Sequence, residues 1–205
     1  MDKISIVTVL KNRYEYLEKS FGFLNTIDHL DCVEHVVVDF DSDDGDVAGL
    51  LSSGKVKYNH VLTYRKFAIN VGRNIGINEA SNELVFISDS DIIVDRNLVK
   101  IINRYVNNNV AYFPTVRDLP PDADIYDIKE SDLGRWRSAG YGMCGITKSM
   151  ANSIGYDENY NKWGGDDWDF YRRLRKKHKI IRNGEHGFYH IHHPRGKGFL
   201  NKYYK

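Results

Sequence analysis

The sequence predicts an α/β protein built on a mostly parallel sheet with helices on both faces. Short apolar runs typical of buried strands alternate with longer segments whose apolar residues recur at helical spacing. The first such pair is a strand over 4–10 and a helix over 13–27. Because strands joined through helices run parallel, we expect one sheet with its ligand site beyond the carboxyl ends of the strands.

The remaining elements continue this alternation until the middle of the chain. Asp95 is the expected N-cap of one helix. Residues 112–141 contain three prolines and an acidic stretch, and we expect them to form a long excursion over the crevice. The other predicted elements are strands over 35–40, 56–62, 84–88 and 143–147, an extended segment over 185–193, and helices over 67–80, 95–106 and 166–177.

Length and composition indicate a single domain over residues 1–205. A hydrophobic content of 41% is enough for a real core. The formal net charge of +1 gives no electrostatic argument for nucleic acid, and we expect no such partner. Cys32 and Cys144 are the only cysteines and lie far apart, which argues against a disulfide framework and favours a reducing, cytoplasmic compartment.

Membrane attachment is expected to be peripheral at most. No apolar run approaches ~18 residues, so no transmembrane span is predicted. The first residues lead straight into a strand-like run, without a visible signal peptide. The basic aromatic tail 202–205 leaves two interpretations open, a contact at a membrane edge or an ordinary frayed end.

Asp89, Ser90 and Asp91 follow a buried apolar strand. Two carboxylates one residue apart at a strand end can share a hard divalent cation, and diphosphate oxygens can complete its coordination. The alternative is a turn or capping cluster, because so short a pattern is common.

Three histidines near the end of the chain can supply nitrogen ligands. In an extended segment His190 and His192 share a face while His193 points the other way, and a local turn would change this. A mixed carboxylate and imidazole site suits Mn²⁺ better than Ca²⁺. A histidine-rich surface turn is the alternative.

Trp163, Gly164, Gly165, Asp166 and Asp167 stand together at the start of a predicted helix. The two glycines let a ligand lie against the backbone. A flat indole can pack on a sugar face, and acids at a helix N-terminus are stabilised by the helix dipole. The pattern suits a polyhydroxylated ligand next to a base, although simple capping by the two acids is an alternative.

Four basic residues are candidates for phosphate contacts. Lys11 and Arg13 stand at the carboxyl end of the first strand, where cations can reach phosphate oxygens. Arg65 precedes the helix predicted over 67–80, and Arg73 lies within it. Taken alone, Lys11 and Arg13 are equally interpretable as a solvated charge pair at a helix start. Lone arginines are usually surface residues, so the case for Arg65 and Arg73 rests on their position.

In combination, these motifs resemble the GT-A glycosyltransferases, specifically family 2 and the related β-1,4-galactosyltransferase and chondroitin-polymerase-type enzymes. Residues 4–13 look like the opening strand and Asn-Arg turn of the family, and residues 72–76 look like its Ala-Arg-Asn-x-Gly helix. Residues 36–44 are similar to the Val-Asp-Asp-Gly-Ser-x-Asp segment, with one departure, because Phe40 stands at a usually acidic position. The resemblance covers the chain from Ile4 to about Pro194.

The resemblance implies a nucleotide-sugar donor, most simply a UDP-sugar, bound with Mn²⁺ or Mg²⁺. Asp91 would bind the metal, and Asp89 would contact the ribose or a metal-bound water. His190 and His193 match the spacing of the late metal ligands in the family. The resemblance assigns residues 1–110 to nucleotide-sugar binding, and it adds three donor contacts from the later motif at 163–165. The implied donor contacts are Val9, Lys11, Arg13, Asp39 or Asp41, Arg65, Arg73, Asp89, Ser90, Asp91, Trp163, Gly164 and Gly165.

The same resemblance assigns residues 111–205 to a glycan, glycolipid or glycoprotein acceptor. Asp167 is the implied base, with Asp166 orienting the acceptor, and Trp136 and Tyr141 can stack on a sugar or simply pack. Direct attack by the acceptor would invert the anomeric carbon, and the second carboxylate favours this over retention.

Two other functions compete with this one. Phe40 at a usually acidic position is the feature that would fit a non-catalytic module that binds a nucleotide sugar or glycan. A nucleotidyltransferase is disfavoured, because residues 9–13 contain no glycine to form a phosphate loop.

Overall fold

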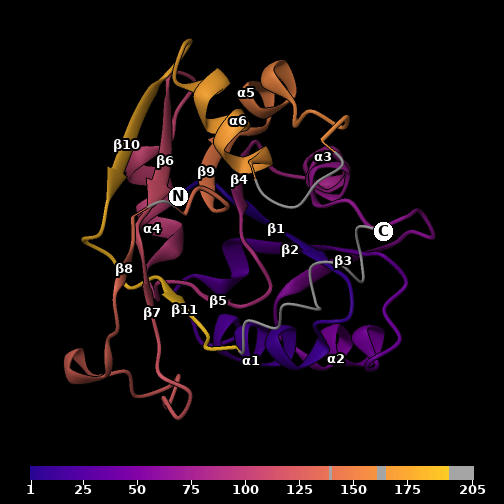
Figure 1. Ribbon diagram of the computed structural model, residues 1–205, viewed down its shortest axis with the longest axis vertical. Coiled ribbons are helices and arrows are strands. Elements are labelled where there is room, and N and C mark those ends of the chain that lie inside the picture. The colour runs from indigo at the N-terminus through magenta and orange to yellow at the C-terminus, as the bar shows by residue number, and fades with distance from the viewer. Residues whose placement is uncertain (139, 161–164, 194–205) are drawn as a thin grey trace.

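The computed structural model describes residues 1–138, 140–160 and 165–193 (Figure 1). Within these ranges seven strands form one sheet in the order β10-β6-β9-β4-β1-β2-β3. The predicted fold class, a mostly parallel sheet flanked by helices, is confirmed. In chain order the strands of this sheet are β1 (Ile4–Leu10), β2 (Val33–Asp39), β3 (Lys57–Leu62), β4 (Leu84–Ile87), β6 (Val110–Pro114), β9 (Cys144–Thr147) and β10 (Lys179–Asn183).

The described helices cover the two faces of this sheet. One apolar core contains residues of α1, α2 and α4, and the other contains residues of α3, α5 and α6. Figure 1 shows α1 and α2 on the opposite side of the strands from α3, α5 and α6. The helices are α1 (Tyr14–Leu24), α2 (Val47–Ser53), α3 (Ile69–Glu79), α4 (Leu98–Tyr105), α5 (Lys148–Ile154) and α6 (Asp166–Leu174), with 3₁₀ turns at Leu30–Cys32 and Glu130–Asp132.

Burial on both faces explains why the central strands are almost continuously apolar. Ile4 and Ile6 of β1 belong to one core and Val7 belongs to the other, as the alternation of side chains along a strand requires. β1 lies between β2 and β4 and is parallel to both. β9 runs antiparallel to β4 and β6, so residues after 110 insert into the same sheet as the first half of the chain.

A second, four-stranded sheet has the order β5-β11-β7-β8. It brings together short segments that are far apart in the sequence, and its strands are β5 (Ile92–Ile93), β7 (Val116–Asp118), β8 (Trp136–Arg137) and β11 (Tyr189–His190). The excursion predicted over 112–141 is therefore corrected: β6, β7 and β8 occupy both of its ends. Pro114 ends β6, where a missing N–H costs no internal ladder bond.

Several boundaries also differ from the prediction. The helix expected over 95–106 begins at Leu98 with Asn97 as its N-cap, so Asp95 is not the cap. The Asp95 carboxylate instead accepts hydrogen bonds from the backbone N–H of Asn97 and of Gly187. The expected extended segment 185–193 is a strand only at Tyr189–His190, and α2, α5 and β10 were not predicted.

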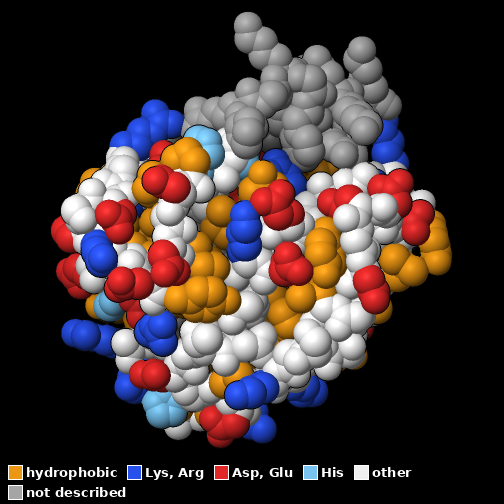
Figure 2. Space-filling view, turned by 90° about the horizontal axis from the view of Figure 1, so that it is seen from below, with side chains coloured by type: hydrophobic (Ala, Val, Ile, Leu, Met, Phe, Trp, Pro, Cys, Tyr) orange, Lys and Arg blue, Asp and Glu red, His pale blue; other side chains and the backbone are white. Residues whose placement is uncertain are grey.

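The molecular surface seen from below mixes charges of both signs. Figure 2 shows acidic and basic side chains interspersed over this face, with apolar patches between them. No helix in the described part of the chain is long and apolar enough to cross a membrane. The tail 202–205, which carried the alternative of a membrane-edge contact, lies outside the described residues.

One polar group lies deep between the sheet and α1. His35 of β2 is 3% exposed, stacks on Phe21 at 5.9 Å and lies 2.9 Å from Thr8 Oγ1 through its Nε2. Burial lowers the pKa of His35 from 6.5 to about 4. The neutral ring is therefore the form that the folded protein accommodates.

We expect acid to destabilise the protein through His35. The unfolded chain binds a proton near pH 6.5 but the folded protein does so only near pH 4. The stability that this difference supplies is present above pH 6.5 and is lost as the pH falls toward 4. At about pH 5 the loss is about 2 kcal/mol. Urea unfolding of wild type and of His35→Gln, above pH 6.5 and at about pH 5, measures this loss of stability.

The variant should show a flatter pH dependence than wild type, because glutamine does not titrate in this range. The matched control is His29→Asn, which removes an exposed histidine at a φ of 58° that asparagine tolerates. A His35→Gln protein that loses as much stability on acidification as wild type would contradict this prediction.

Candidate active site

Polar residues gather where the parallel strands end. Asp39 is the last residue of β2, Asp89 is the second residue after β4, and Lys11 follows β1. Because β1 is parallel to both of the other strands, their carboxyl ends lie at one edge of the sheet. This edge is where sheets of this kind bind ligands.

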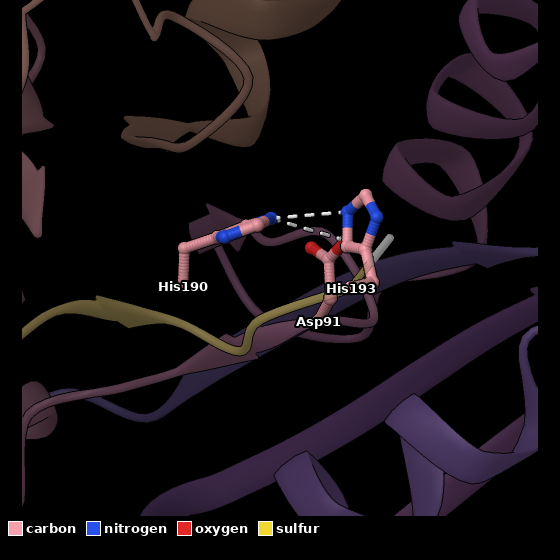
Figure 3. Close-up of side chains that lie close together, drawn as sticks. All are labelled: Asp91, His190 and His193. Atoms are coloured by element: carbon pink, nitrogen blue, oxygen red, sulfur yellow. Dashed lines mark hydrogen bonds and ion pairs between the residues drawn. The ribbon is translucent and has the colours of Figure 1, made fainter. Parts of the chain in front are cut away.

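Among the described residues, Asp91, His190 and His193 form a cluster that can hold a metal ion. Figure 3 shows the three side chains directed toward one another, and one ligand atom from each lies within 4.8 Å of the others. Asp91 Oδ2 is 3.5 Å from His190 Nε2 and 3.3 Å from His193 Nε2. The two Nε2 atoms are 3.2 Å apart.

The short strand β11 explains why these residues meet. It pairs antiparallel with β5, so that His190 lies opposite Ile92, and the backbone N–H of Ile191 donates to the carbonyl of Asp91. The chain turns after β11, which brings His193 to the cluster and leaves His192 exposed. The sequence left two pairs open, His190 with His192 and His190 with His193. The structure brings His190 and His193 together.

The chemistry of this cluster fits a divalent cation. Donor atoms at ~2.1 Å from one ion lie about 3 Å from each other, close to the separations seen here. One carboxylate oxygen with two imidazole nitrogens is a set that suits Mn²⁺ better than Ca²⁺. Burial alone would raise the pKa of Asp91, but the interactions with His190 and His193 outweigh burial and hold that pKa below its usual range.

Asp89 takes a different partner although it is only two residues away. Its Oδ1 accepts a hydrogen bond from Arg73 Nη2 at 3.1 Å, and Arg73 Nη1 donates to Asp166 Oδ2 at 2.9 Å. The Arg73 side chain is 3% exposed and lies over the ring of Tyr156. A single buried guanidinium thus joins the end of β4 to the start of α6.

The space beside this bridge requires glycine. A Cβ on Gly142 would lie 2.9 Å from Asp89 Oδ2 and 3.2 Å from Arg73 Nη2. The protein around Asp89 raises its pKa by removing it from water, Arg73 opposes the rise, and the negative charges of Asp91 and Asp167 add to it. Asp167 therefore lies close enough for its charge to act on Asp89.

Three acids occupy the first turn of α6, and they differ in their partners. Asp166 is buried and paired with Arg73, and Asp169 is paired with Arg172 and Arg173. Asp167 is half-buried, and its Oδ1 accepts only the backbone N–H of Trp168. In the described ranges Asp167 is thus the acid of this turn that forms no ion pair, although its charge acts on Arg73.

Gly165 provides the turn that starts this helix. It is the N-cap residue of α6 with a φ of +92°, a conformation that favours glycine. Trp163 and Gly164, which belong to the same sequence motif, lie outside the described residues.

The loops after β1 and β2 are hydrogen-bonded to each other. Lys11 Nζ donates to the carbonyl of Asp41 at 2.6 Å. The Asp39 carboxylate is buried and accepts from the Ser42 N–H at 3.0 Å, with His60 Nε2 3.3 Å away. Asp41 is exposed, with a φ of 55°. Asp39 therefore shapes this loop, while the Asp41 side chain faces solvent.

The remaining predicted donor residues occupy varied environments. Arg13 lies over the ring of Tyr16 at 5.1 Å, and Arg65 is exposed between β3 and α3. Val9 faces Gly72, where an added Cβ would come within 2.5 Å of it. Ser90 is buried, and its carbonyl accepts from Ser20 Oγ.

Phe40, the departure from the family pattern, is a core residue. It is 2% exposed and meets Phe67 edge-on at 5.3 Å. A Cβ on Gly72 would lie 2.8 Å from its ring. Phe40 thus fills space between β2 and α3, which is a structural reason for an aromatic residue there.

An aromatic cluster lies beside the first turn of α6. Tyr141 lies 4.9 Å from Trp168 and 4.4 Å from Tyr171, with Arg182 over its ring. Trp168 is 45% exposed, so its ring is partly free to contact a ligand. Trp136 is also exposed and packs instead with Arg117, on the second sheet. Trp168 was not singled out from the sequence, although it adjoins Asp167.

Asp118 is a further residue of the site that the sequence did not reveal. Its Oδ1 lies 3.2 Å from His190 Nδ1, on the side of the ring away from the metal cluster. Hydrogen bonds from Arg137 and Arg135 keep the pKa of Asp118 low, although burial opposes this. A cavity of about 250 Å³ adjoins it, lined by Asp118, Leu119, Arg135, Arg137, His190, His192 and His193. No local pattern marks Asp118 within an acidic stretch.

This architecture is that of a GT-A glycosyltransferase. The structure of S. aureus TarS 1-349 in complex with UDP-GlcNAc superimposes with a TM-score of 0.73 at 15% identity, over 95% of this chain and 60% of that one. The mannosyltransferase PcManGT from Pyrobaculum calidifontis, in complex with GDP-Man and Mn²⁺, gives a TM-score of 0.73 at 17% identity, covering 95% and 58%. At these identities the likeness concerns the fold.

The chain belongs to glycosyl transferase family 2, whose profile matches residues 5–142, well over half of its length. Residues 129–194 also match the profile described as the N-terminal domain of galactosyltransferase. Chondroitin sulfate N-acetylgalactosaminyltransferase 2 of Mus musculus is 24% identical over 94% of this chain, and chondroitin sulfate synthase 3 of Homo sapiens is 27% identical over 60%. This chain spans 40% of the first relative and 16% of the second.

We expect the Arg73 bridge to contribute strongly to stability. Arg73→Met would leave Asp89 and Asp166 without their shared cation, which costs about 3–5 kcal/mol when a buried pair is broken. Thermal and urea unfolding measure the loss, and Arg104→Met, at an exposed site on α4, is the matched control.

A double-mutant cycle tests whether the pair is the cause. Arg73→Met combined with Asp166→Asn should destabilise by less than the sum of the single changes, because both remove the same contact. Strict additivity would contradict the bridge as the source of the stability.

Proposed function

We propose that this chain is a metal-dependent glycosyltransferase that moves a sugar from a UDP-sugar to an acceptor hydroxyl with inversion. The observation that carries the proposal is the Asp91, His190 and His193 cluster at the carboxyl edge of a family 2 fold. Asp167, which forms no ion pair within the described ranges and whose charge acts on Asp89, would supply the acceptor half.

On the donor side, Asp91, His190 and His193 would hold the cation. A bound divalent ion supplies positive charge that stabilises the departing diphosphate. Lys11 and Arg13, at the end of β1, would add positive charge near the phosphates. The bound ligands of the two structural neighbours, UDP-GlcNAc in one and GDP-Man with Mn²⁺ in the other, support a nucleotide-sugar donor and a metal.

The nucleoside would lie against the loop after β2. The exposed Asp41 is the available contact there, while the buried Asp39 keeps the loop in shape through Ser42. Because Phe40 has a packing role, its presence gives the non-catalytic alternative no structural support.

On the acceptor side, Asp167 would act as the base. The acceptor oxygen forms a bond to the anomeric carbon while the bond from that carbon to the diphosphate oxygen breaks. The hydroxyl proton passes to the Asp167 carboxylate, and the nucleoside diphosphate leaves with the bonding electron pair. Attack from the face opposite the leaving group inverts the anomeric configuration.

Asp166 would act indirectly. Its hydrogen bond with Arg73 fixes the start of α6 against the end of β4, and so orients Asp167 and the exposed ring of Trp168. Tyr141 and Trp168 form the surface on which an acceptor sugar can stack. The relatives named as chondroitin enzymes support a glycan as that acceptor.

A donor screen tests the metal and the nucleotide. UDP-, GDP- and dTDP-sugars are incubated with the protein, with and without Mn²⁺, and nucleotide release is measured. We expect release of UDP with Mn²⁺, and a loss of about 100-fold or more in Asp91→Ala, because a ligand of the cation is removed. Asp122→Ala, an exposed acid of the same size, should behave as wild type. Undiminished turnover in Asp91→Ala would refute the assignment.

A second experiment separates the roles of the two acids. Asp167→Asn should lower kcat by roughly 10²–10⁴-fold, the usual contribution of a general base, with unchanged affinity for UDP and Mn²⁺. Asp166→Asn should instead lower the stability together with the activity, because it removes a partner of Arg73. Proton NMR of the product reports the anomeric configuration.

Two results would contradict this division of roles. One is a fully stable Asp166→Asn protein that loses more activity than Asp167→Asn. The other is a product that retains the configuration of the donor sugar.

A further inference from the structure

His190 is held between two carboxylates that lie on opposite sides of its ring. Its Nδ1 is 3.2 Å from Asp118 Oδ1, and its Nε2 is 3.5 Å from Asp91 Oδ2 and 3.2 Å from His193 Nε2. The side chain is 7% exposed, so water has little access to either nitrogen. In this orientation of the ring, Nε2 faces the metal cluster and Nδ1 faces Asp118.

The chemistry of these contacts selects one tautomer. A neutral imidazole carries one N–H and one lone pair, and an ionised carboxylate can only accept a hydrogen bond. A proton on Nδ1 satisfies Asp118, and this leaves the Nε2 lone pair directed toward Asp91 and His193. With the proton on Nε2 instead, the lone pair of Nδ1 would face Asp118 Oδ1 at 3.2 Å, and Nε2 could not bind a cation. In the Nδ1–H tautomer the Nε2 lone pair faces Asp91 Oδ2 at the longer distance of 3.5 Å, where both atoms can serve the same cation.

The backbone of Asp118 is fixed from both sides by the second sheet. Its N–H donates to the carbonyl of Arg135, and its own carbonyl accepts from the N–H of Gly134. On the other side, β7 is parallel to β11 with Asp118 opposite His190, and the N–H of Leu119 donates to the His190 carbonyl. The distance from Asp118 to the imidazole is thus set by strand pairing.

Two arginines fix the carboxylate itself. Arg137 Nε donates to Oδ1 at 2.5 Å, and Arg135 Nε donates to Oδ2 at 3.1 Å. With both oxygens engaged, Asp118 is restrained from turning toward the metal cluster as an additional ligand. Asp118 can accept a hydrogen bond from His190, and it is not one of the three side chains that converge in Figure 3.

We propose that Asp118 is a positioning residue, which holds His190 in the Nδ1–H tautomer with its Nε2 directed at a divalent cation. The inference rests on the metal site of the proposed function. It assigns a role to the antiparallel pairing of β7 with β8, because Arg137 of β8 and the preceding Arg135 anchor the carboxylate. Partners of this kind typically change metal affinity by roughly 10–100-fold when they are lost.

The experiment measures Mn²⁺ binding without any sugar transfer. Electron paramagnetic resonance of free Mn²⁺ gives the dissociation constant for the full chain, and long-range ¹H–¹⁵N NMR reports the tautomer of His190. We expect wild type to show the Nδ1–H tautomer. Asp118→Ala should weaken Mn²⁺ binding by about 10–100-fold and abolish the preference for this tautomer. Asp118→Asn, which keeps an oxygen that can accept the N–H, should lie between them.

Asp122→Ala is the matched control, because it removes an exposed acid of the same segment and changes the net charge equally. It should bind Mn²⁺ as wild type does. Thermal unfolding of each variant separates positioning from structure: a purely structural role would lower the melting temperature and leave both the tautomer and the Mn²⁺ affinity unchanged. That outcome overturns the proposal, as does an Nε2–H tautomer in wild type or an equal loss in Asp122→Ala.

These outcomes are distinguishable from failure of the proposed function. A wild-type protein that binds Mn²⁺ through Asp91 but transfers no sugar removes the enzymatic proposal and leaves the role of Asp118 intact. A wild-type protein that binds no Mn²⁺ overturns both. If Asp118→Ala does not fold, Asp118→Asn and the wild-type tautomer still decide the question.

Discussion

The architecture of the site depends on the buried guanidinium of Arg73. It lies on α3 and contacts the end of β4 through Asp89 and the start of α6 through Asp166. A buried charge is costly unless it is paired, so these three groups must assemble together or not at all. This pairing sets where Asp167 lies relative to the sheet, because it joins the end of β4 to the start of α6.

The metal cluster depends on a second constraint, the register of the small sheet. β11 brings His190 beside β5 on one side and beside β7 on the other, so one short strand positions the ligand relative to Asp91 and to Asp118. Strands of two or three residues carry little stability of their own. Here their packing on Phe188 and Ile191, which belong to the main core, supplies it.

The central strands, and their alternation with helices along the chain, were predictable. Each of these strands is a continuous apolar run, so the sequence of the strand itself indicates that it is buried. α2 and α5, with seven residues each, are too short for helical periodicity to stand out, and β10 is a half-buried edge strand with basic residues. Pro114 misled the prediction for β6, since a proline that ends a strand resembles one that begins a loop. The motifs around residues 89–91 and 163–167 were recognisable by residue type alone.

The sequence by itself determined the fold class, the family resemblance and most of the candidate site residues, because these follow from composition, periodicity and short motifs. Only the tertiary structure decided how those side chains pair. In the structure Asp89 pairs with Arg73 and Asp91 lies with the two histidines, although a single residue separates the two acids. It also selected His193 over His192 and placed Asp118 behind His190. The physical reason is that each pairing joins residues far apart in the chain, and strand register and helix packing alone bring them within hydrogen-bonding distance.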